Sequence, residues 1–117
     1  MIEVRLPTHP SSNALYANIP GKGRVKSARY RSWLNSAGWE LQAQRHGVVS
    51  GPYRITIRAH RNNKRSDLGN LDKPISDLLV AHGIIPDDRH AGEIILAWSD
   101  EPARTCRVTI EELQQAA

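Results

Sequence analysis

The stretch that decides the fold is Tyr53-Arg54-Ile55-Thr56-Ile57-Arg58-Ala59, in which apolar and polar side chains alternate strictly. A period of two places alternate side chains on a core and in solvent, as in a β-strand with one buried face. We therefore predict a strand over residues 53–59 whose core-facing members are Tyr53, Ile55, Ile57 and Ala59.

Three further strands are predicted toward the two ends of the chain. Residues 2–6 also alternate apolar and charged side chains, and Pro7 and Pro10 end this strand. Near the C-terminus, two more strands are expected on either side of a turn, over residues 93–98 and 104–110.

Two amphipathic helices are predicted between these strands. Residues 27–45 carry apolar side chains at helical spacing, with Ser27 as the N-cap. The second helix stops before Gly83, and Pro74 places its start within residues 70–73, because proline is tolerated only in the first turn. The packed stripe of the first helix is Tyr30, Leu34, Ala37 and Leu41, and that of the second is Leu71, Ile75, Leu78 and His82.

The predicted order is β-(hairpin)-α-β-α-β-β, which is a mixed α/β (α+β) fold. In such a fold a single layer of mixed sheet is covered by two main helices. The length of 117 residues suits one domain spanning residues 1–117.

Composition restricts the classes of partner and compartment. Sixteen Lys and Arg against twelve Asp and Glu give a net charge of +4, which favours a polyanion as partner. The single cysteine, Cys106, excludes an internal disulfide and fits a small core residue of an intracellular protein. No apolar stretch is long enough for a membrane helix or signal peptide, so we expect a cytoplasmic protein with no membrane partner.

Residues 67–88 contain five of the twelve acidic residues. Like charges repel, so such a cluster on a basic protein favours a bound cation, and Mg²⁺ prefers oxygen ligands of this kind. On a helical wheel Asn70, Lys73 and Asp77 fall within roughly 60° of one another, opposite the apolar stripe. Asp67 precedes this polar face and the pair Asp87-Asp88 follows the helix, so the chain can build one metal site.

A purely structural explanation of these residues stays open. Asp67, Asn70 or Asp72 can cap a helix, Lys73 can pair with Asp77 one turn later, and Asp87-Asp88 can be turn residues.

Basic residues precede this cluster in two groups. The hairpin predicted over residues 15–26 has a Gly-rich turn and carries Lys22, Arg24 and Lys26. The second group directly precedes the carboxylates and consists of Arg61, Lys64 and Arg65. We expect both groups to contact the phosphates of a polyanion, and the alternative is a solvated surface. The lack of base-reading motifs favours recognition of the shape of a nucleic acid.

The sequence contains no histidine metal-binding motif and no nucleotide-binding motif. The five histidines lack metal-ligand spacing, and there is no P-loop, so no nucleotide cofactor is expected. We expect the three tryptophans, Trp33, Trp39 and Trp98, to fill the core or a dimer interface rather than stack on bases.

The acidic segment resembles the RusA family of Holliday junction resolvases, whose signature is Asp-x-Asp-Asn-x-x-Lys after a basic stretch. The matching residues are Arg65, Asp67, Asn70, Lys73, Asp77, Gly83, Asp87 and Asp88. The N-terminal Leu6-Pro7, Pro10-Ser11, Asn13 and Tyr16 are also similar to the family pattern.

This resemblance implies a homodimeric endonuclease that resolves four-way DNA junctions with Mg²⁺, or with Mn²⁺ in its place. It implies catalytic roles for Asp67, Lys73 and Asp88, and a phage or prophage setting. Supporting roles fall to Asn70, Asp77 and Asp87, and the metal ligands would be Asp67, Asp87 and Asp88.

One position departs from the family pattern, because Gly69 stands where the second Asp is expected. Asp72 is the nearest replacement but fits better as the N-cap of a helix that starts at Lys73, whereas Asp77 shares a face with Lys73. Three hypotheses follow: an active junction endonuclease, a junction-binding protein with weakened or lost catalysis, and a small domain without a nucleic-acid role.

Overall fold

The computed structural model describes residues 1–11, 14–44, 46–61 and 67–113. The main sheet has four strands, β1 (Ile2–Pro7), β4 (Tyr53–Ala59), β5 (Ala91–Trp98) and β6 (Thr105–Glu112). Their order in space is β1-β6-β4-β5. Only β4 and β5 run parallel, while β6 pairs antiparallel with both β1 and β4, so the predicted mixed sheet is confirmed.

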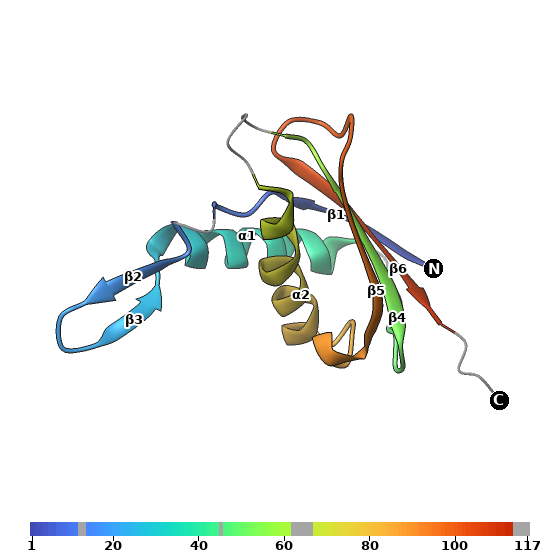
Figure 1. The fold of residues 1–117 in the computed structure, drawn as a ribbon, viewed down its shortest axis with the longest axis horizontal. Helices are drawn as coiled ribbons and strands as arrows, with labels where there is room; N and C mark the ends of the chain where they lie inside the picture. The colour runs from blue at the N-terminus through green and yellow to red at the C-terminus, as the bar shows by residue number, and fades with distance from the viewer. Residues whose placement is uncertain (12–13, 45, 62–66, 114–117) are drawn as a thin grey trace.

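Both helices lie on the same side of this sheet (Figure 1). They are α1 (Ala28–Ala43) and α2 (Asp72–Ala81), and short 3-10 helices precede and follow α2, η2 (Leu68–Leu71) and η3 (Asp88–His90). The predicted order of elements and fold class are confirmed. None of the described helices is both long and apolar enough to cross a membrane.

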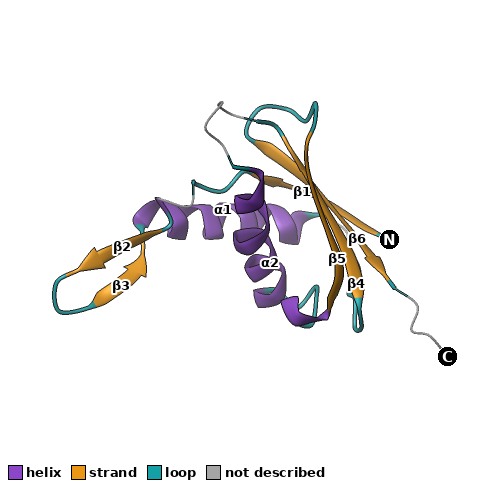
Figure 2. Cartoon of the chain, in the orientation of Figure 1, coloured by secondary structure: helices purple, strands orange, loops and turns teal. Residues whose placement is uncertain are grey.

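A two-stranded hairpin of β2 (Tyr16–Ile19) and β3 (Gly23–Lys26) projects away from the sheet and the helices (Figure 2). Its turn contains Gly21 and Gly23 with φ values of +81° and +76°, a region that glycine adopts without strain. We call this hairpin the basic arm. It confirms the hairpin predicted over residues 15–26.

The core forms where the alternating strand residues meet the helix stripes. All four predicted core residues of β4 are 0% exposed, and Cys106 on β6 is equally buried. Burial raises the pKa of the Cys106 thiol to about 12, so it stays protonated. Cys106 is therefore an inert core residue, as predicted.

The first helix follows the sequence prediction closely. The Ser27 hydroxyl accepts a hydrogen bond from the Tyr30 N–H at 3.1 Å and so caps α1. Trp33 is also buried, and its indole N–H donates to the Pro7 carbonyl at 2.7 Å. The helix ends at Ala43, before the predicted end at Arg45, which lies outside the described residues.

The second helix differs from the prediction at one position of its stripe. Leu71, Ile75 and Leu78 are buried as expected, but His82 is exposed. The helix ends at Ala81, and Gly83 with φ +72° turns the chain, so the His82 side chain leaves the core-facing stripe and lies against Gly38 of α1.

Candidate functional site

Lys73 lies at the centre of the acidic cluster. Its Nζ atom is 3.0 Å from Oδ1 of Asp77 and 3.1 Å from Oδ2 of Asp88. Asp77 follows one turn later on α2, whereas Asp88 returns to this position only after the helix has ended and the chain has entered η3. Hydrogen bonds to Asp77 and then Asp88 raise the pKa of the Lys73 ammonium. All three side chains are at least 41% exposed, so the cluster is accessible to a ligand.

Asp87 is held beside this cluster by hydrogen bonds. Its carboxylate accepts from the backbone N–H of Arg89 at 3.0 Å and from the Arg89 Nε at 3.2 Å. The backbone bond from Arg89 is the main cause of a lowered pKa of the Asp87 carboxyl, followed by a hydrogen bond with Asp88. Asp87 therefore stays ionised next to Asp88.

Tyr53 supports the acidic pair from the core. Its hydroxyl donates to the backbone carbonyl of Asp87 at 3.4 Å. Burial raises the pKa of Tyr53 to about 12, with the charges of Asp88, Asp72 and Asp87 adding to the effect. Tyr53 therefore remains a hydrogen-bond donor at neutral pH. The alternating pattern predicted Tyr53 as a core residue alone, and no sequence signal distinguished this second role.

Asp67 and Asn70 lie at the preceding turn, η2. The Asp67 carboxylate accepts from the Gly69 N–H at 3.1 Å, and its backbone carbonyl accepts from the Asn70 N–H at 3.1 Å. Among the residues that the structure describes, neither Asp67 nor Asn70 forms an ion pair with Lys73 or a hydrogen bond with Asp88. The structure thus brings Lys73 and three of the predicted carboxylates together, while Asp67 and Asn70 remain on the neighbouring turn.

Asp72 does not cap α2, contrary to the prediction. Because η2 runs directly into α2, Leu71 occupies the N-cap position and Asp72 is the first helical residue. Asp67 provides the cap instead, because the backbone N–H groups that lack a helical partner lie at the start of η2. The Asp72 carboxylate instead accepts from the Ser76 hydroxyl at 2.7 Å, which holds it on α2.

Gly69 has room for a side chain. A Cβ atom there would lie 3.6 Å from Oδ1 of Asp67, which is an ordinary van der Waals distance. Gly69 is also absent from the glycines with positive φ. The backbone therefore does not require glycine here, and the missing carboxylate is not explained by steric crowding.

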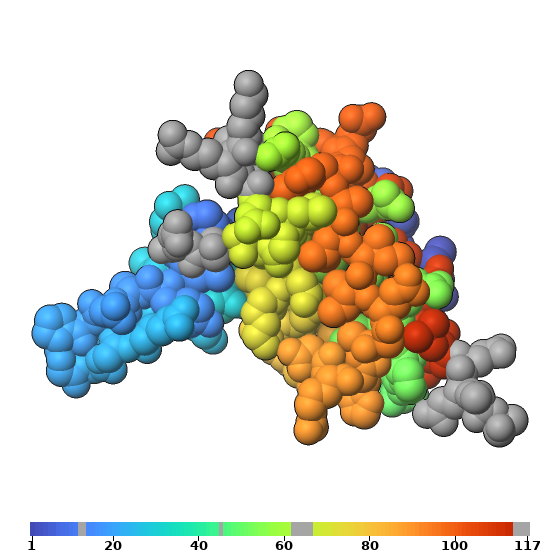
Figure 3. All heavy atoms as spheres, in the orientation of Figure 1, coloured from blue at the N-terminus to red at the C-terminus, as the bar shows by residue number. Residues whose placement is uncertain are grey.

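The basic arm leads from solvent toward Lys73. Arg24 lies over the Tyr16 ring at 4.2 Å from its centroid, and Lys26 lies over the Tyr30 ring at 5.9 Å. Lys22 is exposed in the turn. The space-filling view shows the arm standing clear of the rest of the molecule (Figure 3). Its cations are therefore open to a polyanion.

Two tyrosines connect the arm to the acidic cluster. The Tyr16 and Tyr30 rings meet edge to face with centroids 5.7 Å apart. Burial is the main cause of the raised pKa of Tyr30, and the charge of Asp77 contributes to it while that of Lys73 opposes it. Tyr30 therefore contacts the arm and also senses the charges of the Lys73–Asp77 ion pair. The helical spacing predicted Tyr30 only as part of a packed stripe.

The second basic group is described only in part. Arg61 is exposed and its guanidinium lies 5.8 Å from the centroid of the Trp98 ring. Lys64 and Arg65 lie outside the described residues.

The donor atoms of the cluster fit a hard divalent cation. Within residues 1–11, 14–44, 46–61 and 67–113, no three Asp, Glu, His or Cys side chains form a ready metal site. The positively charged Lys73 ammonium nevertheless lies between the carboxylates of Asp77 and Asp88, so the cluster already accommodates a positive charge from the protein itself. Mg²⁺ in phosphate-processing sites usually takes one or two carboxylates and completes its shell with water and phosphate oxygens.

A family of known proteins matches most of this chain. The family model described as endodeoxyribonuclease RusA matches residues 6–111. A search of curated proteins finds no match. The matched range includes the basic arm, both helices, the whole acidic cluster and most of the sheet.

Proposed function

Because the chain belongs to the RusA family of endodeoxyribonucleases, which act on Holliday junctions, we propose that it is a divalent-cation-dependent enzyme that hydrolyses phosphodiester bonds in four-way DNA junctions. The observation that carries this proposal is the contact of Lys73 with Asp77 and Asp88, two carboxylates that the chain brings together from α2 and η3.

DNA would be held first by the basic residues. Lys22, Arg24 and Lys26 would contact phosphates along the arm, joined by Arg61, Lys64 and Arg65 next to the carboxylates. The four-way shape of the DNA, rather than its base sequence, would determine where the arm can lie.

A divalent cation, Mg²⁺ or Mn²⁺, would be held by Asp67 and Asp88 with support from Asp87. When bound, such an ion lowers the pKa of water and compensates charge on the phosphate. The carboxylates suit this role, because Asp87 is kept ionised by Arg89 and all of them are at least partly exposed.

Lys73 would neutralise charge that develops on the phosphate oxygens. Its raised pKa keeps the ammonium protonated at neutral pH, and Asp77 positions it one turn along the same helix. Fixed positive charge of this kind is most effective where charge appears in the transition state. Asn70, exposed on η2, is a further hydrogen-bond donor for the substrate.

A second candidate function follows from Gly69. Without the second Asp of the family signature, the protein would bind junctions and cut them slowly or not at all. The basic arm does not depend on Gly69, so DNA binding would persist.

We further propose that the protein acts as a homodimer. A junction is resolved by two cuts in strands of like polarity, and each chain carries a single Lys73 cluster. Light scattering of the free protein and of the junction complex measures the stoichiometry, and one chain on each junction would contradict this part of the proposal.

The deciding experiment uses a synthetic four-way junction labelled on each strand in turn, with a linear duplex of the same sequence as control. Paired nicks in Mg²⁺ or Mn²⁺ that are absent in EDTA support the enzyme. Retarded migration without nicks supports the binding protein. Equal affinity for junction and duplex at moderate salt would contradict both.

A further inference from the structure

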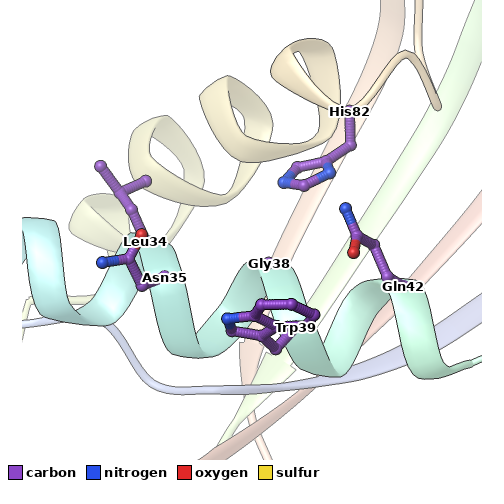
Figure 4. A pocket seen from close by; sticks show the side chains of 6 residues that line it. All are labelled: Leu34, Asn35, Gly38, Trp39, Gln42 and His82. Carbon is purple, nitrogen blue, oxygen red and sulfur yellow. The ribbon is translucent and has the colours of Figure 1, made fainter.

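A hollow between α1 and the end of α2 has an unusual lining (Figure 4). Its volume is about 290 Å³, close to the lower limit of small-molecule pockets. The lining residues are Leu34, Asn35, Gly38, Trp39, Gln42 and His82, so no charged side chain takes part.

Trp39 is the dominant feature of this hollow. It is 74% exposed, whereas Trp33 on the same helix is 5% exposed. Trp39 therefore does not fill the core of the chain, and of the two predicted locations, the core and a dimer interface, only the second stays open for it. A Trp side chain left in water forgoes a large favourable burial, so a ligand that covers it gains that free energy.

The polar side chains around Trp39 are exposed and have no partner within the part of the protein that the structure describes. Among the described residues, the side chains of Asn35, Gln42 and His82 form no hydrogen bond. Gln44, only two residues beyond Gln42, bonds with its side chain to the backbone of Arg5 and of Glu40. The hollow thus offers a flat aromatic surface with free donors and acceptors beside it.

The packing of the two helices keeps the hollow open toward His82. A Cβ atom at Gly38 would lie 3.1 Å from Nε2 of His82, so only glycine lets the imidazole approach α1 this closely. In Figure 4 the side chains of Trp39 and Gln42 extend from α1, and the His82 side chain approaches α1 from the end of α2.

The hollow lies on an exposed stripe of α1. Arg31, Asn35 and Gln42 recur at positions i, i+4 and i+11 of α1, so they form one stripe within roughly 40°. The charges of Asp77 and Lys73 act on Tyr30, and from Tyr30 to Gly38 the helix advances about 12 Å, the length of roughly three to four stacked nucleotides. Arg31 is exposed and stands between them, suited to a phosphate.

We propose that this hollow binds an unpaired nucleobase of the DNA, stacked on Trp39 and hydrogen-bonded by Asn35, Gln42 and His82. A base is planar, uncharged and rich in donors and acceptors, which matches the lining. A second copy of the chain is the competing occupant, and the oligomeric state of Trp39→Ala distinguishes it from a base. The inference rests on the proposed function only for the choice of DNA as ligand.

The test measures base stacking directly and without cleavage. Four-way junctions carrying 2-aminopurine at successive positions near the branch point are titrated with the protein in EDTA, and fluorescence and affinity are recorded. We expect a fluorescence change at one position a few nucleotides from the cut. Trp39→Ala should abolish it and weaken binding roughly 5- to 150-fold, the range for loss of one base–aromatic stack. Trp39→Phe should restore part of the affinity.

Matched controls separate the explanations. Val48→Ala removes another exposed apolar side chain, 68% exposed and not among the residues that line the hollow, and should bind as the unaltered protein. Unchanged fluorescence and affinity in Trp39→Ala would overturn the inference. The inference is also overturned if Trp39→Ala converts a dimer to a monomer while the base signal is retained, because the hollow would then be a contact between copies. If the protein gives the Trp39-dependent signal but never cuts in Mg²⁺, the nuclease proposal fails and the base site stands.

Discussion

The Lys73 ammonium lies 3.1 Å from the carboxylate of Asp88, which follows it by 15 residues in the chain. Between them the chain completes α2, reverses at Gly83 and enters η3. Asp77 shares the same ammonium, so one cation neutralises two carboxylates. This arrangement is the most specific geometric feature of the site, and several expected outcomes depend on it.

Replacing Asp88 by Asn should abolish junction cleavage and leave junction binding equal or tighter. The change removes a proposed metal ligand and also a negative charge near the phosphates. Cleavage is followed on a labelled junction and binding by gel retardation in EDTA. Asp100→Asn, an exposed carboxylate in the turn before β6, is the matched control and should cut normally. Retained cleavage in Asp88→Asn would remove this residue from the metal site.

Replacing Lys73 by Met should slow cleavage by roughly 10²-fold or more, the typical effect of losing one group that stabilises transition-state charge. The melting temperature should change little, since exposed ion pairs contribute about 0–1 kcal/mol. Single-turnover rates and thermal unfolding are measured together. Arg58→Gln removes an exposed cation from the sheet face away from the helices and serves as control. A normal rate in Lys73→Met would contradict the assigned role.

Replacing Gly69 by Asp should increase both the affinity for Mg²⁺ and the cleavage rate. The side chain has space beside Asp67, and its carboxylate restores the family signature. Titration of the rate with Mg²⁺ separates affinity from maximal rate. Gly69→Asn provides the same shape without the charge and should gain much less. Equal behaviour of Gly69→Asp and the unaltered chain would show that another carboxylate already performs this task.

Replacing Lys22, Arg24 and Lys26 together by Gln should weaken junction binding and make it less sensitive to salt. If each contacts one phosphate, the slope of log affinity against log salt should decrease by roughly 2–3. Binding is measured between low and moderate salt by fluorescence anisotropy. An unchanged slope would mean that the arm does not lie along the DNA backbone.

The stability of the protein should fall as the pH decreases below about 6.5, the ordinary value for His. His9 is 8% exposed, its ring meets Trp33 edge to face, and burial is the main cause of a lowered His9 pKa. Between the folded and unfolded pKa values the unfolded chain binds more protons, so the free energy of unfolding decreases on acidification and levels off below the folded pKa.

His9→Phe keeps an aromatic ring against Trp33 without a titrating group. Its free energy of unfolding should therefore depend less on pH than that of the unaltered protein, by at most about 1.4 kcal/mol per pH unit. Denaturant unfolding at pH 5, 6, 7 and 8 measures the difference. Parallel pH profiles for the two proteins would contradict the role of His9.

The strands and helices were largely predictable from local pattern. Residues 53–59 form β4 over the predicted bounds, because alternation with period two permits only one face to be buried. Ser27 caps α1 as predicted, since a side-chain hydroxyl satisfies a nearby backbone N–H without help from the rest of the chain. Such features depend on interactions within a few residues.

The site required information that local pattern does not contain. Asp72 does not cap α2, because η2 continues directly into α2. Lys73 contacts Asp88 as well as Asp77, because the chain turns back after Gly83. Tyr53 and Tyr30 were predicted only as core residues, yet the Tyr53 hydroxyl donates to the Asp87 carbonyl and the charges of Asp77 and Lys73 act on Tyr30. Trp39 was predicted to lie in the core or in a dimer interface, and its exposure in the single chain follows from which side of α1 the sheet and α2 leave open.

The residue types and their order were therefore sufficient to identify the elements, the acidic cluster and the family pattern with its missing carboxylate at Gly69. Which side chains meet across the gap between α2 and η3, and which remain in solvent, depends on contacts between residues distant in the sequence. Those contacts form only when the helices pack on the sheet, because burial of the apolar stripes fixes how each helix is rotated and so where its polar side chains lie.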